Sequence, residues 1–329
     1  MQLTNSPVDN FILQDRQILV KRDELLDQRF NGNKARKLAY YITNSFPTID
    51  TLISYGGTQS NMLSALSELA KIKSWSLIYY CYKPSQMALN NSHGNLATAL
   101  HNGTQFNYVD KDLDSFMAKS TIQQNQLLIH QGARQAESQF GIQQLANEIN
   151  QYCLTNLIDK LALFIPSGTG ASAYYLQKLL PQHIVYTTNC VGTAEYLLKQ
   201  WRSLDSNATI LPIILPNKSF RFATPDKLLW KTIDHITQIS QIEFDLVYDP
   251  VGWHILINNM HAIELPIMYI HCGGLIGNHS MQKRYDYLFT NKSENKAFIK
   301  SFKPASPTTV CLNTPACSKT KAKRFATSL

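Results

Sequence analysis

Two segments near the N-terminus decide the fold: Gly32-Asn33-Lys34-Ala35-Arg36-Lys37-Leu38 and Gly56-Gly57-Thr58-Gln59-Ser60-Asn61. The first places a lysine where a loop gives way to a helical pattern. The second follows an apolar run and precedes another helical pattern, so it joins a strand to a helix. Its small and hydrogen-bonding residues allow two interpretations, a plain turn with Ser60 as helix N-cap or a loop that faces a polar ligand.

Lys34 also allows two interpretations from the residues alone. It can be a solvated lysine near a helix start, which is the usual state of a lysine. The neighbouring cations Arg36 and Lys37 favour a reactive amine, because nearby positive charge lowers the pKa of a lysine and frees its nucleophilic form. A lysine beside a polar turn at a strand end is suited to hold a carbonyl cofactor as an imine.

Apolar runs alternate with helical patterns along most of the chain, which is typical of an α/β fold with mainly parallel sheets. Strands are expected at residues 51–55, 76–81, 105–109, 126–130, 161–165, 183–187, 209–214, 244–248 and 267–271. Helices are expected at about residues 60–71, 94–101, 113–119, 141–152 and 171–180. Glycine-rich turns follow three of the strands, at the end where ligands bind in such folds.

One of these turns, Ser167-Gly168-Thr169-Gly170-Ala171-Ser172, lies between an apolar strand and a helix. Glycines let a ligand approach the backbone, and the free N–H groups of a helix start favour an anion. The segment is therefore either a phosphate cradle or a tight strand-to-helix turn. It is not a Walker loop, because no lysine follows its last glycine.

The net charge of +8 is concentrated at the C-terminus. Residues 291–329 carry eight cations and one acid, a net of +7, which leaves about +1 for the rest of the chain. This Ser-, Thr-, Pro- and Lys-rich tail is expected to be disordered. A nucleic-acid partner is not expected for the folded part, although a basic tail that contacts nucleic acid stays an alternative.

The remaining composition excludes several classes of protein. No apolar run is long enough for a membrane span, and residues 1–10 lack the pattern of a secretory signal. The six cysteines are scattered without a C-x-x-C pair, so neither a disulfide framework nor a metal site is expected. We therefore expect a cytoplasmic protein with reduced thiols.

The ordered set of motifs resembles the pyridoxal-phosphate enzymes of fold type II, the tryptophan-synthase β type. Within them it is most similar to the 1-aminocyclopropane-1-carboxylate deaminase and D-cysteine desulfhydrase family. The matching segments are Lys21-Arg22-Asp23-Glu24-Leu25, the two opening segments, Gln131-Gly132-Ala133, 141–149, Ser167-Gly168-Thr169-Gly170 and Tyr269-Ile270-His271-Cys272-Gly273-Gly274. The resemblance covers about residues 20–285.

This resemblance implies two open, mostly parallel three-layer domains with the cofactor in the cleft between them. We expect a large cofactor-binding domain at 1–45 and 157–290, a small domain at 46–156 and a tail at 291–329. It also implies a homodimer, and a deaminase or lyase that acts on a small amino acid.

The resemblance also assigns roles to individual residues. It makes Lys34 the Schiff-base lysine, and Ser60 a second catalytic residue. It implies that Asn61 binds the phenolic oxygen of pyridoxal 5'-phosphate. Gln59, Ser60 and Asn61 meet the substrate in this interpretation. Ser167, Gly168, Thr169 and Gly170 hold the phosphate.

One departure concerns the substrate side. The family has a late Asp-Pro-Val-Tyr segment whose tyrosine lines the substrate site and whose neighbour reaches the pyridine nitrogen in some members. Here Asp249-Pro250-Val251 is followed by Gly252, which predicts a rebuilt pocket. Tyr248, Trp253, His254 and Tyr269 either line that pocket or pack in the core. A catalytically silent protein that binds pyridoxal phosphate for regulation or cofactor handling is the alternative to an enzyme.

Overall fold

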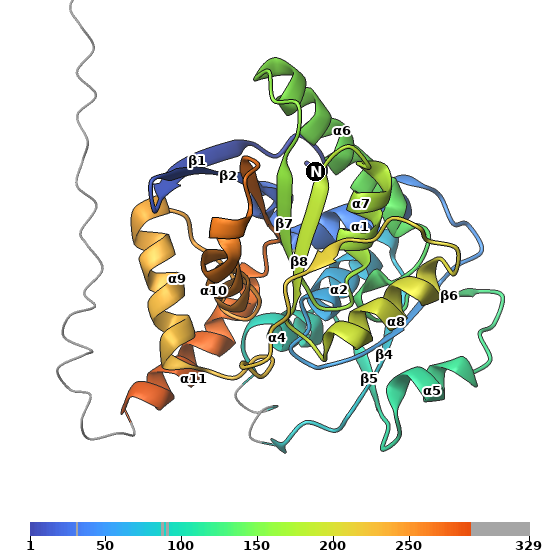
Figure 1. Ribbon diagram of the computed structural model, residues 1–329. Helices are drawn as coiled ribbons and strands as arrows, with labels where there is room; N and C mark the ends of the chain where they lie inside the picture. The colour runs from blue at the N-terminus through green and yellow to red at the C-terminus, as the bar shows by residue number, and fades with distance from the viewer. Residues whose placement is uncertain (31, 87–88, 90–91, 291–329) are drawn as a thin grey trace, which may run out of the picture. The chain divides into compact units, whose positions relative to one another are not determined.

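Two sheets, both mostly parallel, form the framework of the described chain (Figure 1). The computed structural model describes residues 1–30, 32–86, 89 and 92–290. Residues Met1–Leu288 form one compact unit. The basic tail expected at 291–329 lies outside the described residues.

The larger sheet has the strand order β1-β2-β10-β7-β8-β9. Its strands are β1 (Val8–Leu13), β2 (Arg16–Arg22), β7 (Ala162–Ser167), β8 (Ile184–Asn189), β9 (Ile213–Ile214) and β10 (Ile267–His271). β1 pairs antiparallel with β2, and every other neighbouring pair is parallel. The sequence patterns did not predict the β1–β2 pair.

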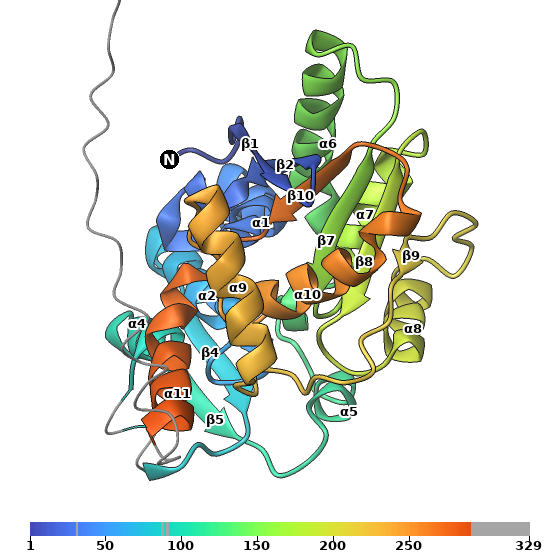
Figure 2. The same ribbon diagram turned by 60° about the vertical axis from the view of Figure 1, so that its left-hand side comes forward.

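Helices cover both faces of this sheet. Successive residues of a strand point to opposite sides, so the apolar residues of β7 pack against helices on each face. In β7, Leu163 packs with α6 (Ser138–Thr155), α7 (Ala171–Leu179) and α8 (Ala194–Leu204). Its neighbour Phe164 packs with α9 (Lys227–Ser240) and α10 (Asp249–Asn259). Figure 2 shows α9 and α10 on one side of β7 and β8. The result is a three-layer arrangement.

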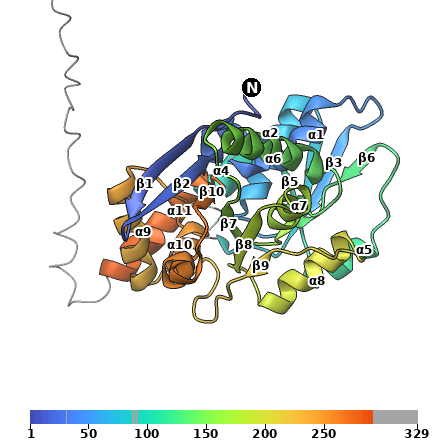
Figure 3. The ribbon, with the colours of Figure 1, turned by 45° about the horizontal axis from the view of Figure 1, so that its top comes forward.

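The smaller sheet has the order β5-β4-β3-β6 and is entirely parallel. Its strands are β3 (Thr51–Tyr55), β4 (Ser76–Cys81), β5 (Gln105–Tyr108) and β6 (Gln126–Leu128). One face packs on α1 (Asn33–Thr43), α2 (Asn61–Lys73) and α4 (Gly94–His101), and the other on α5 (Leu113–Ala118). Figure 3 shows α1 and α2 beside β3.

Short 3-10 turns and a last helix complete the described chain. They are η1 (Asp23–Leu25), η2 (Gln28–Phe30), η3 (Gln131–Ala133), η4 (Met260–Ala262), η5 (Leu275–Gly277) and α11 (Asn278–Thr290). None of the helices in the described ranges combines the length and apolar character needed to cross a lipid bilayer.

The α/β class with two mostly parallel sheets is confirmed, and one strand prediction is wrong. Residues 244–248 form no strand. The Asp245 carboxylate accepts the backbone N–H groups of Val247 and Tyr248 and turns the chain into α10. The strand expected at 209–214 shortens to Ile213–Ile214. The domain boundaries at residues 45 and 156 stay a prediction.

Candidate active site

Lys34 lies at the start of α1, which is fixed to the carboxyl end of β10. The Asn33 N–H donates to the Cys272 carbonyl at 2.8 Å. Gly32 has a φ of +78°, and a Cβ there would lie 2.3 Å from the same carbonyl oxygen. Only glycine allows this approach, so the sequence Gly-Asn-Lys sets Lys34 beside Cys272.

Two lysines share this part of the site. Burial lowers the pKa of Lys34, while Cys272, Asp245 and Asp249 oppose that effect. Lys34 Nζ donates to Asn33 Oδ1. Burial and the positive charge of Lys34 lower the pKa of Lys37 to about 7. Burial, rather than the neighbouring cations Arg36 and Lys37, therefore lowers the pKa of Lys34, whereas the charge of Lys34 does act on Lys37. Arg36 is paired with Asp23 and Glu148 instead.

The second segment reaches the same place from the smaller sheet. Ser60 is the N-cap of α2 and accepts the Met62 N–H at 3.1 Å. Asn61 Oδ1 accepts a hydrogen bond from Asn95 Nδ2 at 2.7 Å. A Cβ on Gly274, whose φ is +105°, would lie 2.7 Å from Asn61 Nδ2 and 2.3 Å from Asp245 Oδ2. The turn after β10 thus brings Asn61 and Asp245 together, whereas Gln59 lies exposed at the rim.

The glycine-rich turn Ser167–Gly170 joins β7 to α7 and meets Lys37 through Gly132. A Cβ on Gly132 would lie 2.7 Å from Thr169 Oγ1, and the Gly132 carbonyl accepts from Lys37 Nζ at 2.9 Å. Ser167 Oγ lies 2.7 Å from Thr187 Oγ1, so this hydroxyl already has a partner in β8. The turn and a buried cation therefore face one another.

Ser172 lies in the segment predicted as a possible phosphate cradle, although the resemblance assigned the phosphate only to Ser167, Gly168, Thr169 and Gly170. It is the second residue of α7, and its Oγ is buried with no hydrogen-bond partner among the described residues. A buried hydroxyl without a partner is costly in a folded protein, and a ligand can supply the missing bond. Its position two residues after Gly170, in the first turn of α7, was the available signal.

A buried carboxyl pair, Asp245 and Asp249, lies close enough to Lys34 to affect its pKa. Asp249 Oδ2 accepts the Asp245 N–H at 3.0 Å, and Asp249 Oδ1 accepts from the Tyr269 hydroxyl at 2.7 Å. Burial raises the pKa of both carboxyls, and Asp245 raises that of Asp249 further. The pair therefore holds a proton more readily than two exposed aspartates would.

Tyr248, and not the residue at position 252, places a tyrosine ring near the glycine-rich turn. Gly252 is buried in α10, where a Cβ would lie 2.7 Å from the Tyr269 hydroxyl and 3.1 Å from Pro166. The Tyr248 ring instead lies against the glycine-rich turn, 3.3 Å from an ideal Cβ on Gly168. Tyr248 therefore places an aromatic ring at this turn, and the rebuilt pocket expected around Gly252 stays a prediction.

The other aromatic candidates have different roles. Trp253 and Tyr269 stack at 4.0 Å between ring centroids with an interplanar angle of 7°, in the core beneath the sheet. His254 packs edge-on against Phe220 at 5.0 Å on the half-buried side of α10. Core packing is therefore the correct interpretation for Trp253 and Tyr269.

A buried ion network explains why the matched segments contain so many charges. Arg36 Nη2 donates to Asp23 Oδ1 at 2.8 Å and Arg36 Nη1 to Glu148 Oε1 at 2.6 Å. Lys21 Nζ donates to Glu148 Oε2 at 2.7 Å. Two cations and two carboxylates thus balance one another where β2, α1 and α6 meet. They fix the helix that carries Lys34.

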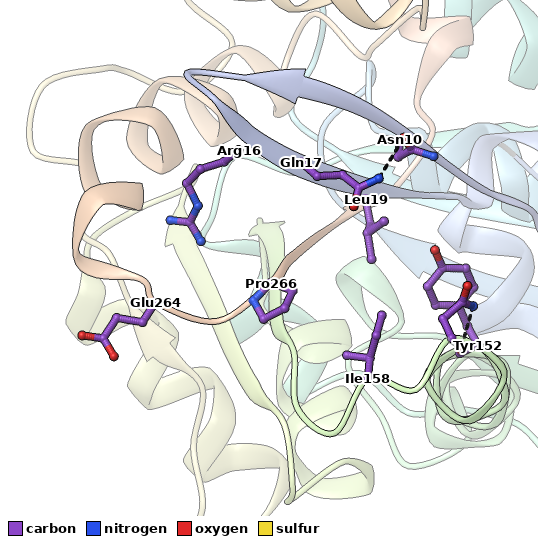
Figure 4. A pocket seen from close by; sticks show the side chains of 9 residues that line it. Asn10, Arg16, Gln17, Leu19, Tyr152, Ile158, Glu264 and Pro266 are labelled. Carbon is purple, nitrogen blue, oxygen red and sulfur yellow. Dashed lines mark hydrogen bonds between the residues drawn. The ribbon is translucent and has the colours of Figure 1, made fainter.

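A surface depression lies at the opposite end of the larger sheet, as Figure 4 shows. It is lined by residues at the start of β2 and β10, including Arg16, Gln17 and Pro266. Arg16 is engaged there with the carbonyls of Met260 and Leu265, at 2.5 and 2.9 Å. The five residues of β10 separate it from the lysines by about 16 Å.

Comparisons with known proteins agree with this geometry. No family model matches the chain. A D-cysteine desulfhydrase from Klebsiella pneumoniae is 26% identical over 287 residues, which cover 79% of this chain and 87% of that protein. The crystal structure of a homologue of ACC deaminase has a TM-score of 0.72 at 18% identity and covers 86% of this chain and 94% of its own.

A pyridoxal 5'-phosphate-dependent aspartate racemase is also similar in fold, with a TM-score of 0.55 at 13% identity. The match covers 83% of this chain and 90% of that chain. The sequence relative and the shared fold both agree with the ordered motifs around Lys34. The described chain has the tryptophan synthase β-like fold of the type II pyridoxal-phosphate enzymes and is similar in sequence to a D-cysteine desulfhydrase.

Proposed function

We propose that this protein is a pyridoxal-phosphate-dependent lyase of small amino acids, with Lys34 as its Schiff-base residue. The observation that carries the proposal is the meeting of Lys34, Asn61 and the Ser167–Gly170 turn at the carboxyl end of β10 and β7. The desulfhydrase relative favours a D-cysteine desulfhydrase-like reaction. A 1-aminocyclopropane-1-carboxylate deaminase-like reaction is the second candidate, supported by the fold likeness.

The residues present fit the phosphate group of this cofactor. The free N–H groups at the start of α7 favour an anion. The Ser172 hydroxyl lacks a partner that a phosphate oxygen would supply. Lys37 is a buried amine whose pKa of about 7 would rise beside a phosphate, so it would bind as a cation. These groups and the Ser167–Gly170 turn would hold the phosphate.

The other side of the site fits the ring and the reacting atoms. Asn61 would bind the phenolic oxygen, and the Asp245–Asp249 pair is the carboxyl group available to the ring nitrogen. When bound, the cofactor would supply an electron sink at the substrate Cα. Lys34, with its lowered pKa, would accept and return the proton at that carbon.

The substrate would lie between Lys34 and the Gly56–Asn61 turn. Ser60 Oγ accepts the Met62 N–H and also makes a side-chain hydrogen bond with Tyr79, which holds the hydroxyl at this turn. Together with Gln59 it would bind the substrate carboxylate. The exposed position of Gln59 at the rim suits a residue that orders when a ligand enters.

The test is a comparison of wild type, Lys34→Ala and Lys71→Ala, an exposed lysine of α2, after incubation with pyridoxal phosphate. We expect a bound chromophore in wild type and Lys71→Ala and none in Lys34→Ala. A panel of D- and L-amino acids with 1-aminocyclopropane-1-carboxylate should then release pyruvate with sulfide, or 2-oxobutanoate. Protein that stays colourless contradicts the proposal, and coloured protein that forms no product favours the silent binding protein.

A further inference from the structure

The loop after β9 begins beside the candidate active site. The Asn217 N–H donates to Asn189 Oδ1 at 2.9 Å, and Asn189 Nδ2 donates back to the Asn217 carbonyl at 3.1 Å. Asn189 ends β8 and pairs in register with Ser167, the first residue of the glycine-rich turn. Side-chain and backbone bonds therefore fix this loop at the carboxyl edge of the sheet, next to the proposed phosphate site.

Phe222 in this loop extends the surface formed by Tyr248. The two ring centroids lie 5.3 Å apart, and the Phe222 side chain remains 42% exposed. Tyr248 is held from behind, because Asp245 accepts its N–H and its carbonyl lies 3.7 Å from Cys190 Sγ. Two aromatic rings thus run outward from Gly168 towards solvent, and the outer one is open to a ligand.

This aromatic wall carries no charge at neutral pH. Burial raises the pKa of Tyr248 above its ordinary range, and the Asp245 charge raises it further. Burial does the same for Tyr79, which faces the Gly56 turn from the smaller sheet. A charged substrate side chain would find no counterion in either ring. An apolar group would cover the exposed face of Phe222 and remove it from water.

We propose that Phe222 and Tyr248 form a specificity wall that selects amino acids with an extended, uncharged apolar side chain. This inference rests on the proposed function, since it assumes that amino acids bind in front of Lys34. It extends the substrate class of the proposed function from small amino acids to those with a longer apolar side chain, and it leaves the role of Lys34 unchanged. Phe222 contacts the far end of the side chain and Tyr248 the part nearer to the cofactor.

The experiment measures binding of unreactive straight-chain amino acids to the wild-type protein loaded with pyridoxal phosphate. Alanine, 2-aminobutyrate, norvaline and norleucine, as both enantiomers, are titrated by calorimetry and by the change in the visible spectrum. Each added methylene that is buried on Phe222 should tighten the dissociation constant about fourfold. Norleucine should therefore bind more than tenfold tighter than 2-aminobutyrate. Aspartate should bind more weakly than either.

Phe222→Ala and Phe140→Ala form a matched pair, because both phenylalanines are 42% exposed and Phe140 lies in α6. Loss of the methylene dependence in Phe222→Ala but not in Phe140→Ala supports the wall. The inference is overturned if the affinity of wild type does not rise with each methylene, or if Phe222→Ala keeps that rise. In either case the proposed function stands. If the loaded protein binds neither enantiomer of alanine and turns over no amino acid, the proposed function fails first.

Discussion

Glu148 allows a quantitative test of the buried ion network, because its carboxylate joins both cations. Burial opposes its ionisation, but hydrogen bonds and charge from Arg36, with a hydrogen bond from Lys21, outweigh that effect and lower its pKa to about 2. The side chain is 11% exposed, so solvent screens these interactions little. Glu148→Gln keeps the shape of the residue and removes its charge.

The size of the effect follows from the pKa shift from 4.5 to about 2. One pKa unit corresponds to about 1.4 kcal/mol, so the ionised carboxylate stabilises the fold by about 3 kcal/mol at pH 7. Because the folded pKa is depressed, this stabilisation is present above pH 4.5 and is lost as the pH falls towards 2. About 1.4 kcal/mol should remain at pH 3.

Equilibrium urea unfolding of wild type, Glu148→Gln and Glu264→Gln at pH 7, 5, 4 and 3 measures this dependence. Glu264 is exposed, so its variant should match wild type within about 0.5 kcal/mol. Glu148→Gln should be less stable by about 3 kcal/mol at pH 7 and should approach wild type as the pH falls. A difference below about 1 kcal/mol at pH 7, or one that does not change with pH, would refute the reasoning.

Three further substitutions test the cofactor site. Lys37→Gln should weaken pyridoxal-phosphate binding about 10- to 100-fold, because a charged hydrogen bond is lost. The binding of pyridoxal, which lacks the phosphate, should not change. Equal losses of affinity for both ligands in absorbance titrations would contradict this role. Ser172→Ala should leave the stability of the cofactor-free protein within about 0.5 kcal/mol of wild type, since its hydroxyl has no hydrogen-bond partner among the described residues. It should weaken cofactor binding about fivefold. A large loss of stability in thermal unfolding without cofactor would argue for a structural role. Gly274→Ala should destabilise the fold by about 1–3 kcal/mol and impair cofactor binding, because its Cβ would lie 2.3 Å from Asp245 Oδ2. Gly103 also has a positive φ, +78°, but a Cβ there would meet nothing within 4 Å. The same binding loss in Gly103→Ala would therefore rule out the steric explanation.

Buried parallel strands were predictable from the sequence because they read as short apolar runs, three of which are followed by glycine-rich turns. β3 and β4 have the expected bounds, and so does α4. The strand predicted at residues 244–248 is absent. These residues are as apolar as a strand, but the Asp245 side chain hydrogen-bonds to the backbone nearby and prevents an extended conformation.

The site was only partly predictable for physical reasons. Lys34 and Asn61 belong to local motifs, so the resemblance of those motifs to the family was enough to expect both residues in one site. Ser172 sits in an ordinary helical stretch, and only its missing hydrogen bond makes it distinctive. The partnership of Arg36 with Glu148 joins residues far apart in the chain, so no local pattern could predict it.

The hydrogen bond from Asn33 to Cys272 has a consequence for how the protein is made. The residues that it joins are roughly 240 positions apart, and closing such a loop costs about 5 kcal/mol of chain entropy. During synthesis, α1 and its lysine leave the ribosome long before β10 exists. The Lys34 amine therefore stays exposed to solvent, with an ordinary pKa, until β10 has been synthesised and has folded. The chain therefore acquires the ability to bind a cofactor late in synthesis. A chain truncated before Cys272 would contain Lys34 but not the buried surroundings that lower its pKa.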